Sequence, residues 1–299
     1  MTRGAPGHEV DPLATTAALT VAQDICSLRP DPASGHREES SQSMRAPEPS
    51  PAPLRSRGAT ERGPAQARMY DGGAEEFAET ISPSLTRTHR EEGTGAGTSP
   101  LLRAIEIAIA ATMLILTLPL MLLIAAIITA DSPGRALFFQ TRIGRNGRRF
   151  TFVKFRTLYA DAQRRFPELY AYRYSADDLR TLRFKIDNDP RVTPQGRWLR
   201  KSSLDELPNF WNVLTGDMAL VGPRPEIPEM LPYYTGDMLS KFSVRPGITG
   251  LAQISGRGRL TFLETVACDL EYVRNRSLTE DAKILFKTAK MILLRDGAF

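Results

Sequence analysis

A run of 24 residues without a charged side chain, residues 107–130, dominates the hydrophobic pattern of this chain. At about 1.5 Å of rise per residue, one helix of this length covers roughly the 30 Å hydrocarbon thickness of a bilayer. Soluble helices this long usually show a polar face, and this run has none, so the pattern predicts a membrane helix rather than a buried core helix. A cleaved signal peptide is excluded, because the run begins about 100 residues too late.

Pro119 lies at the centre of this run. A proline inside a helix removes a backbone donor and clashes with the preceding turn, so it bends the helix. Each arm beside Pro119 is about 12 residues, or roughly 18 Å, too short to cross alone. These residues leave two topologies open: a kinked spanning helix, or a re-entrant hairpin with both ends on one side. Basic residues after the run favour a cytoplasmic location for the C-terminal flank. They are Arg135, Arg142, Arg145, Arg148, Arg149, Lys154 and Arg156.

The pattern after the run predicts short strands and then helices. Residues 138–140, 142–144 and 150–156 are typical of short strands around a turn at Asn146-Gly147. Residues 161–189 are polar with a helical pattern, which predicts a surface helix with an insertion.

Residues 1–98 differ in composition from the rest of the chain. The first 100 residues hold half of the 22 prolines, all three histidines and no lysine. Few apolar residues recur there at helical or strand spacing, so the segment cannot bury enough surface to offset its ordering entropy. We predict a disordered tail over 1–98, a membrane helix over 99–131 and a catalytic domain over 132–299.

The positive charge is concentrated outside this tail. The first 100 residues carry ten arginines against 14 acidic residues, and the whole chain carries +5, so residues 101–299 carry +9. Such a domain binds nucleic acid, an anionic membrane surface or a phosphorylated substrate. The chain has no zinc-finger, RNA-recognition or helix-turn-helix signature, and the adjacent apolar run favours the last two partners over nucleic acid.

Residues 101–299 contain no histidine, which excludes several kinds of chemistry. A Ser-His-Asp triad and a Cys-His pair both need a histidine. Zinc sites built on histidine are excluded too, and no phosphate loop of the Gly-x-x-x-x-Gly-Lys-Ser/Thr type is present. Any catalysis in this domain must therefore use carboxylates, lysine, arginine and a hard metal ion.

The adjacent carboxylates Asp205 and Glu206 are the first candidates for that chemistry. Ser202 or Ser203 could cap a helix that begins near Leu204, and the acids would then only stabilise its first turn. In the chemical alternative, adjacent helical side chains point about 100° apart. One carboxylate could then attack a phosphorus while the other binds a metal ion.

Candidate anion-binding cations lie in strands and in stiff loops. Lys154 and Arg156 alternate with an apolar residue, so both would share one face of a strand and could hold phosphate oxygens. Arg224 lies between two prolines, which fix its backbone, and its planar guanidinium suits a diphosphate. Arg245 begins a second rigid loop of the same kind, Arg-Pro-Gly.

Together these motifs resemble the bacterial sugar transferases, the monotopic phosphoglycosyl transferases that start polysaccharide repeat units on a lipid carrier. The resemblance covers residues 100–297. It rests on several motifs in the same order: Lys154-Phe-Arg156, Ser203-Leu-Asp-Glu-Leu-Pro208, Trp211-Asn-Val-Leu214, Gly222-Pro-Arg-Pro225 and Arg245-Pro-Gly-Ile-Thr-Gly250.

The resemblance implies a mechanism. Members of this family move a sugar-1-phosphate from a nucleoside diphosphate sugar to undecaprenyl phosphate. Asp205 would be the nucleophile that releases UMP and forms an aspartyl phosphosugar, and Glu206 would bind Mg²⁺. Asp269 matches a family position with a metal or structural role. Lys154, Arg200 and Arg224 match phosphate-binding cations.

The resemblance also implies a location and a fold. The family's apolar segment is a re-entrant helix-break-helix, so we expect the break at Pro119, although this chain has Leu118-Pro119 where the family commonly has Ser-Pro. Glu106 stands at the position where the family usually has an aspartate. The expected fold is α+β: a re-entrant hairpin plus a small, mostly helical domain with a short β-hairpin, on the cytoplasmic face of the bacterial inner membrane.

The substrate and the assembly are less well defined by the sequence. The motif 211–214 and the long 161–195 region resemble members that use UDP-hexoses, which favours UDP-glucose or UDP-galactose. The sequence leaves open whether the chain acts as a homodimer. Two rival functions are a membrane-docked regulator that binds nucleotide sugars without turnover, and a nucleic-acid-binding membrane protein, which charge alone supports.

Overall fold

The computed structural model describes residues 99–256 and 258–294. The predictions of a tail over 1–98 and of disorder within it lie outside these residues. After the long helix α3, the described chain forms mostly short helices and strands and ends with the longer helices α9 and α10. The order of the elements is as follows. They are α3 (Pro100–Asp131), β1 (Leu137–Ile143), η1 (Arg145–Gly147), β2 (Arg149–Phe155), α4 (Ala162–Arg165), η2 (Pro167–Tyr170), α5 (Ala176–Thr181), α6 (Pro194–Ser202), η3 (Leu204–Asn209), α7 (Phe210–Thr215), β3 (Ala219–Val221), η4 (Pro228–Tyr233), η5 (Gly236–Ser243), β4 (Gly247–Thr249), α8 (Leu251–Gly256), α9 (Phe262–Asn275) and α10 (Leu278–Leu294).

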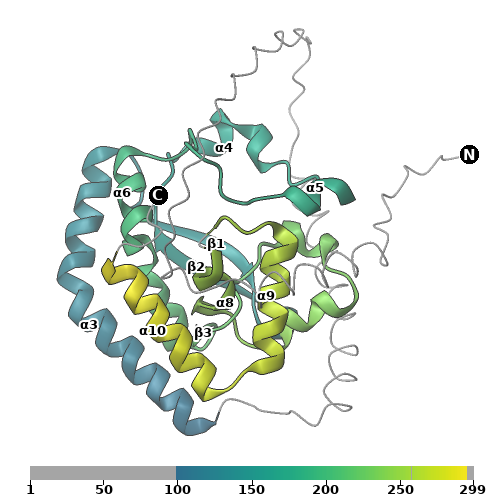
Figure 1. Cartoon of the computed structure of the whole chain (residues 1–299). Helices are drawn as coiled ribbons and strands as arrows, with labels where there is room; N and C mark the ends of the chain where they lie inside the picture. Colours follow the sequence, from purple (N-terminus) through teal and green to yellow (C-terminus); the bar gives the residue numbers. More distant parts are fainter. Residues whose placement is uncertain (1–98, 257, 295–299) are drawn as a thin grey trace, which may run out of the picture.

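Helix α3 contains the apolar run and continues through Pro119 as one helix. It bends around one side of the domain, with the two small sheets at the centre and α9 on the opposite side (Figure 1). The hydroxyls of Thr117 and Thr129 bond to the backbone carbonyls of Met113 and Ala125, so they expose no unpaired donor on this apolar helix. The structure thus shows a bent helix and leaves the re-entrant topology as a prediction.

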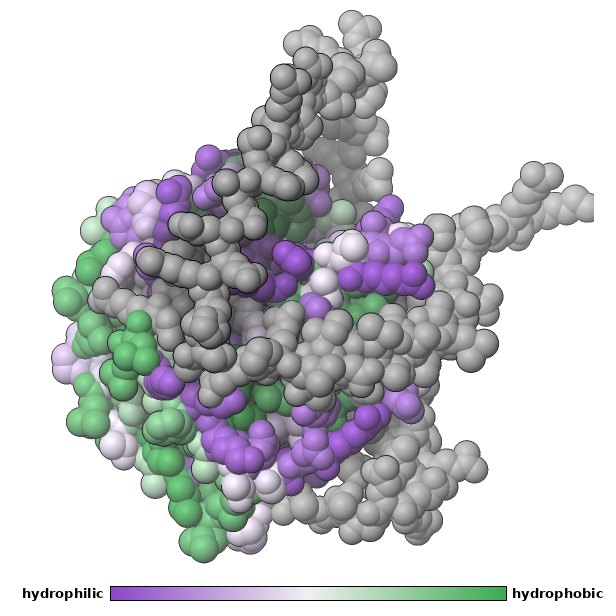
Figure 2. Space-filling model, in the orientation of Figure 1, coloured by the Kyte–Doolittle hydropathy of each residue, from purple (hydrophilic) through white to green (hydrophobic). Residues whose placement is uncertain are grey.

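Most of α3 does not pack against the rest of the molecule. Its most apolar 18-residue window has a mean hydropathy of 2.6, and only 11% of that window is buried. Figure 2 shows hydrophobic side chains gathered along the side of the molecule that α3 occupies. By length and composition α3 is therefore able to cross a membrane, and its exposed apolar surface suits lipid.

The first turns of α3 are held against the domain by polar contacts. Arg103 donates hydrogen bonds to the carbonyls of Val213 and Met218 and pairs with Glu106 at 2.9 Å. Glu106 also accepts a hydrogen bond from the backbone N–H of Leu220. Glu106 therefore joins the apolar helix to β3.

The predicted β-hairpin is confirmed. Strands β1 and β2 pair antiparallel, with Phe138 opposite Lys154 and Arg142 opposite Phe150. The turn residues Asn146 and Gly147 both have positive φ, which Asn-Gly adopts readily in hairpin turns.

A second sheet brings the two Arg-Pro loops together. Strands β3 and β4 are parallel, and glycines in and beside them allow a very close approach of their backbones. A Cβ atom on Gly247 would lie 2.1 Å from the Gly222 nitrogen, and one on Gly250 would lie 2.2 Å from the Gly222 oxygen. Only glycine fits at these positions, so the loop that contains Arg224 and the loop that begins at Arg245 lie against each other.

The helix predicted over 161–189 is wrong, since that region forms the short elements α4, η2 and α5. Pro167 explains the first interruption, because the residue before a proline avoids helical geometry. Phe166 accordingly has φ −134° and ψ 60°. In its coarse class the fold agrees with the α+β prediction, as helices surround two two-stranded sheets.

Candidate active site

The carboxylates Asp205 and Glu206 lie in η3, a tight 3₁₀ helix that follows a sharp break in the chain. Ser203 ends α6 with a φ of 58°, and η3 begins directly after it. The side chain of Ser203 makes no capping bond to η3, so the predicted serine cap is absent. With about three residues per turn, Leu204 and Leu207 share one face of η3.

That leucine face fixes η3 on the apolar helix. Leu204 and Leu207 pack against a buried cluster that includes Ile124 and Ile128 of α3. Both isoleucines follow Pro119, so the carboxylates are placed beside the second arm of α3. Asp205 is 8% exposed, whereas the Glu206 side chain is 22% exposed.

Three cations from three elements surround this carboxylate pair. Lys154 comes from β2, Arg200 from α6 and Arg224 from the loop after β3. Arg224 Nη1 lies 2.8 Å from Glu206 Oε1, and all three cations lower the pKa of Asp205. We call these five residues the carboxylate site.

The pKa of Asp205 is nevertheless raised to about 6. Burial is the largest cause, followed by the negative charge of Glu206, and the opposing effects of Lys154, Arg224 and Arg200 are smaller. Burial likewise lowers the pKa of Lys154 to about 8, although Asp205 opposes that change. Near pH 7 the site therefore combines a carboxylate that is mostly ionised with a lysine that is mostly charged.

Arg200 is oriented by neighbours outside the carboxylate pair. Its Nε donates a hydrogen bond to Thr157 Oγ1 at 3.0 Å, and its Nη1 lies 3.9 Å from Asp189 Oδ2. Asp189 is 7% exposed and is itself held by Arg191 at 2.9 Å. The irregular 161–193 region thus supplies an anchor for one cation of the site, which the sequence reasoning did not identify.

Arg142 is a further residue that sequence reasoning missed at the site. It donates hydrogen bonds to the Pro225 carbonyl at 3.1 Å and to Gln140 at 2.8 Å. Burial, with the nearby charge of Arg224, lowers its pKa to about 10. The register of the hairpin contained the signal, because cross-strand pairing puts Arg142 on the same face as Lys154.

Three of the predicted site residues lie elsewhere. Arg156 caps the end of α3, where its guanidinium donates to the carbonyls of Ser132 and Pro133. The charged groups that affect the pKa of Arg245 are Arg103, Arg145, Glu106 and Arg276, none of which belongs to the carboxylate site. Asp269 is 1% exposed and pairs with Lys241 at 3.1 Å. We do not include these three residues in the proposed anion or metal site.

Glu206 remains the candidate metal ligand. Within the described residues, no group of three or more His, Cys, Asp or Glu side chains is arranged to hold a metal ion. Mg²⁺ usually needs fewer protein ligands, because it binds one or two carboxylates together with substrate phosphates and water. A partly exposed carboxylate beside three cations that suit substrate phosphates fits that pattern.

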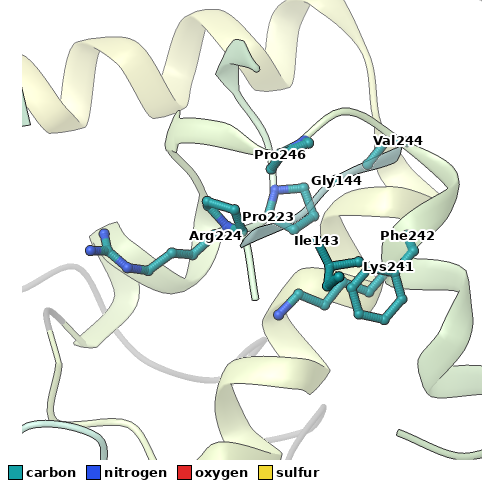
Figure 3. Close-up of a pocket in the computed structure, with 9 residues that line it drawn as sticks. Ile143, Gly144, Pro223, Arg224, Lys241, Phe242, Val244 and Pro246 are labelled. Carbon is teal, nitrogen blue, oxygen red and sulfur yellow. The ribbon is translucent and has the colours of Figure 1, made fainter. Parts of the chain in front are cut away.

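The loop that presents Arg224 has two different sides. A small pocket on one side is lined by Pro223, Pro246 and Phe242. The guanidinium of Arg224 points away from Phe242 and Val244 (Figure 3), on the side where it meets Glu206. The two prolines therefore hold the Arg224 side chain toward the carboxylates and its backbone toward the interior.

A model of the family described as bacterial sugar transferase matches residues 98–295. This match covers well over half of the chain and includes all five residues of the carboxylate site. The chain belongs to the bacterial sugar transferase family.

Named relatives share the same region. An undecaprenyl-phosphate galactose phosphotransferase of Salmonella typhimurium is 43% identical over 197 residues, which are 66% of this chain and 41% of that protein. An undecaprenyl-phosphate glucose phosphotransferase of Komagataeibacter xylinus is 39% identical over 208 residues, 66% of this chain and 36% of that protein. The exopolysaccharide production protein ExoY of Rhizobium meliloti is 39% identical over 198 residues, 66% of this chain and 87% of ExoY.

Proposed function

We propose that this bacterial sugar transferase moves a sugar-1-phosphate from a UDP-sugar to undecaprenyl phosphate, and so initiates a lipid-linked glycan. The observation that carries the proposal is the pair Asp205-Glu206 within a ring of three cations, in a domain without histidine. Two named relatives act on undecaprenyl phosphate, with galactose and with glucose. UDP-galactose and UDP-glucose are therefore the proposed donors.

Asp205 is proposed as the nucleophile. One carboxylate oxygen attacks the phosphorus that bears the sugar, the bond from that phosphorus to the bridging oxygen breaks, and UMP leaves with the electron pair. An oxygen of undecaprenyl phosphate then attacks the same phosphorus, and the Asp205 carboxylate leaves unchanged. A carboxylate needs no general base for this role, which agrees with the absence of histidine.

The cations would position the diphosphate and stabilise charge on it. Arg224 and Arg200 are forked donors suited to phosphate oxygens, and Lys154 supplies a point charge. Preorganised charges of this kind provide much of the rate in phosphoryl transfer. Glu206 would hold Mg²⁺, which when bound neutralises part of the diphosphate charge before an anionic nucleophile approaches.

We propose that α3 is a re-entrant hairpin that holds this site at the cytoplasmic face of the inner membrane. The contact of η3 with the arm of α3 after Pro119 supports the proposal, since it joins the carboxylate site to the apolar helix. Single cysteines at positions 99 and 135, in a variant without native cysteine, test the topology in spheroplasts. Both should resist a membrane-impermeant thiol reagent added outside, and labelling of position 99 alone would indicate a spanning helix.

A UMP-release assay with undecaprenyl phosphate and a panel of UDP-sugars tests the function. We expect release with UDP-glucose or UDP-galactose, and a phosphosugar adduct on Asp205 by mass spectrometry when the acceptor lipid is withheld. Binding of UDP-sugars without UMP release would instead indicate the regulator without turnover.

A further inference from the structure

A second group of charges lies near the carboxylate site but is largely shielded from solvent. Lys241 is 3% exposed, and its amino nitrogen lies 3.3 Å from Glu226 Oε2 and 3.1 Å from Asp269 Oδ2. Tyr234 donates a hydrogen bond of 2.6 Å to the same Glu226 oxygen and receives one of 2.9 Å from Lys241. We call Glu226, Tyr234, Lys241 and Asp269 the sealed cluster.

The sealed cluster joins three elements that are distant in sequence. Glu226 ends the loop after β3, Lys241 lies in η5, and Asp269 lies in α9. Lys241 is the only cation within 4.0 Å of both carboxylates among the described residues. Loss of its charge would therefore leave Glu226 and Asp269 as two buried like charges, and the loop would no longer be tied to α9.

The loop that the cluster anchors is the loop that presents Arg224. Its start is fixed where the Gly222 N–H donates to the Thr249 carbonyl at 2.9 Å. Its end is fixed where the Glu226 carbonyl accepts from the Ile143 N–H at 2.8 Å and the Pro225 carbonyl accepts from Arg142. Arg224 lies between these points with a proline on each side, so displacement of Glu226 moves the Arg224 backbone directly.

Stability alone gives a weak reason for such a cluster. Buried ion pairs are often no more stabilising than apolar side chains of similar size, since desolvation offsets the attraction. Geometry gives a stronger one, because salt bridges and hydrogen bonds hold carboxylates in defined places where apolar packing would tolerate shifts. Arg224 lies 2.8 Å from Glu206 in the carboxylate site, and small displacements of catalytic groups are costly.

We propose that Lys241 is a positioning residue for Arg224, acting through Glu226 and Asp269 on the loop 222–226. The proposal rests on the proposed function for its kinetic readout, and amide exchange provides a second readout that does not need turnover. Asp269 then contributes to the reaction through Lys241 rather than through a metal ion.

The first experiment compares Lys241→Met with Met238→Ala in the full chain. Met238 is fully buried in the same element, η5, so its truncation creates a cavity and serves as a control for general destabilisation. In Lys241→Met we expect the amides of residues 222, 224 and 226 to exchange at least tenfold faster than in Met238→Ala, at temperatures chosen for equal global stability. Equal exchange in the two variants would overturn the proposal.

The second experiment is a double-mutant cycle with Arg224→Lys, read as kcat/KM for UMP release. We expect Lys241→Met to lower kcat/KM about 30-fold in the wild-type background. In the Arg224→Lys background we expect a loss of less than threefold, because the guanidinium that Lys241 would position is already absent. A purely structural Lys241 would cause the same loss in both backgrounds, and that result would refute the proposal.

Two further arms keep the test decisive. If Lys241→Met does not fold, the double variant Lys241→Met/Asp269→Asn removes one charge of each sign and takes its place in both experiments. If wild-type protein releases no UMP from any UDP-sugar, the proposed function fails, while the exchange comparison still decides whether Lys241 holds the loop.

Discussion

The carboxylate site and the sealed cluster contain the same kinds of residue but differ in access. Each has an aspartate, a glutamate and at least one cation, and burial is the first cause that raises the pKa of its aspartate to about 6. In the carboxylate site the side chains of Arg224 and Glu206 are 42% and 22% exposed. In the sealed cluster those of Lys241 and Asp269 are 3% and 1% exposed.

This difference in exposure means that the carboxylate site can bind an anion, whereas the charged side chains of the sealed cluster pair with one another. A diphosphate can reach Arg224 and Glu206, so their mutual contact can be exchanged for substrate contacts. The partners of Lys241 are largely shielded, with the side chains of Glu226 and Asp269 11% and 1% exposed, so its charge serves to place them. Residue type alone would assign both groups to catalysis, and access together with pairing separates them.

Removal of the proposed nucleophile should give the largest effect. We expect Asp205→Asn to reduce UMP release by roughly 10⁴-fold or more, since the other carboxylate of the site, Glu206, is paired with Arg224 at 2.8 Å. The stability of the folded protein should not decrease. Because the folded-state pKa of Asp205 is raised from 3.8 to about 6, its ionisation costs stability as the pH rises through that window, by up to about 3 kcal/mol.

Asparagine avoids this cost, so thermal unfolding at pH 7.5 should occur at an equal or higher temperature than in the wild type. Unfolding measured beside UMP release thus separates lost chemistry from a lost fold. Release of UMP at the wild-type rate by Asp205→Asn would remove the carboxylate site from the mechanism.

Truncation of the accessible cation should give the next largest effect. We expect Arg224→Ala to lower kcat/KM for UMP release by about 10²- to 10³-fold, the usual loss for one preorganised donor to a charged transition state. Arg148→Ala is the matched control, because it removes the same charge from an exposed turn of the hairpin. Similar losses in both variants would mean that total charge, and not the placement of Arg224, supports the reaction.

The metal requirement should separate the two acidic pairs. We expect EDTA to abolish UMP release, Glu206→Gln to raise the Mg²⁺ concentration for half-maximal activity at least tenfold, and Asp269→Asn to change it less than threefold. The physical reason is that Glu206 faces the proposed diphosphate, while Asp269 is occupied by Lys241. A tenfold shift in Asp269→Asn would return Asp269 to the metal site.

Local patterns predicted much of the fold correctly. The Asn-Gly turn, the alternation after it and the uncharged run each depend on near neighbours, and the hairpin and α3 followed from them. The region 161–189 failed because Pro167 interrupts the helix and because tertiary contacts, such as that of Asp189 with Arg200, shape the rest.

The candidate site was predictable where a motif kept its partners close in sequence. Asp205 and Glu206 lie within one turn of η3, and the prolines beside Arg224 indicated a stiff presenting loop. Arg156 could not be placed by alternation, since it lies just beyond the end of β2 and meets the carbonyls that directly follow α3 instead. Asp269 could not be separated from the site because its partner Lys241 is 28 residues away and belonged to no recognised motif.

The pH dependence should give the smallest and most specific effect. Asp205 must be ionised and Lys154 protonated, so kcat/KM should rise through pH 6 and fall through pH 8. Burial lowers the pKa of Lys154, whereas an arginine at this position stays charged. Lys154→Arg should therefore cost less than tenfold at pH 7 and move the falling limb up by more than one pH unit. An unmoved falling limb would mean that another group titrates there. Lys154 would then not be the cation whose titration distinguishes the open carboxylate site from the sealed cluster.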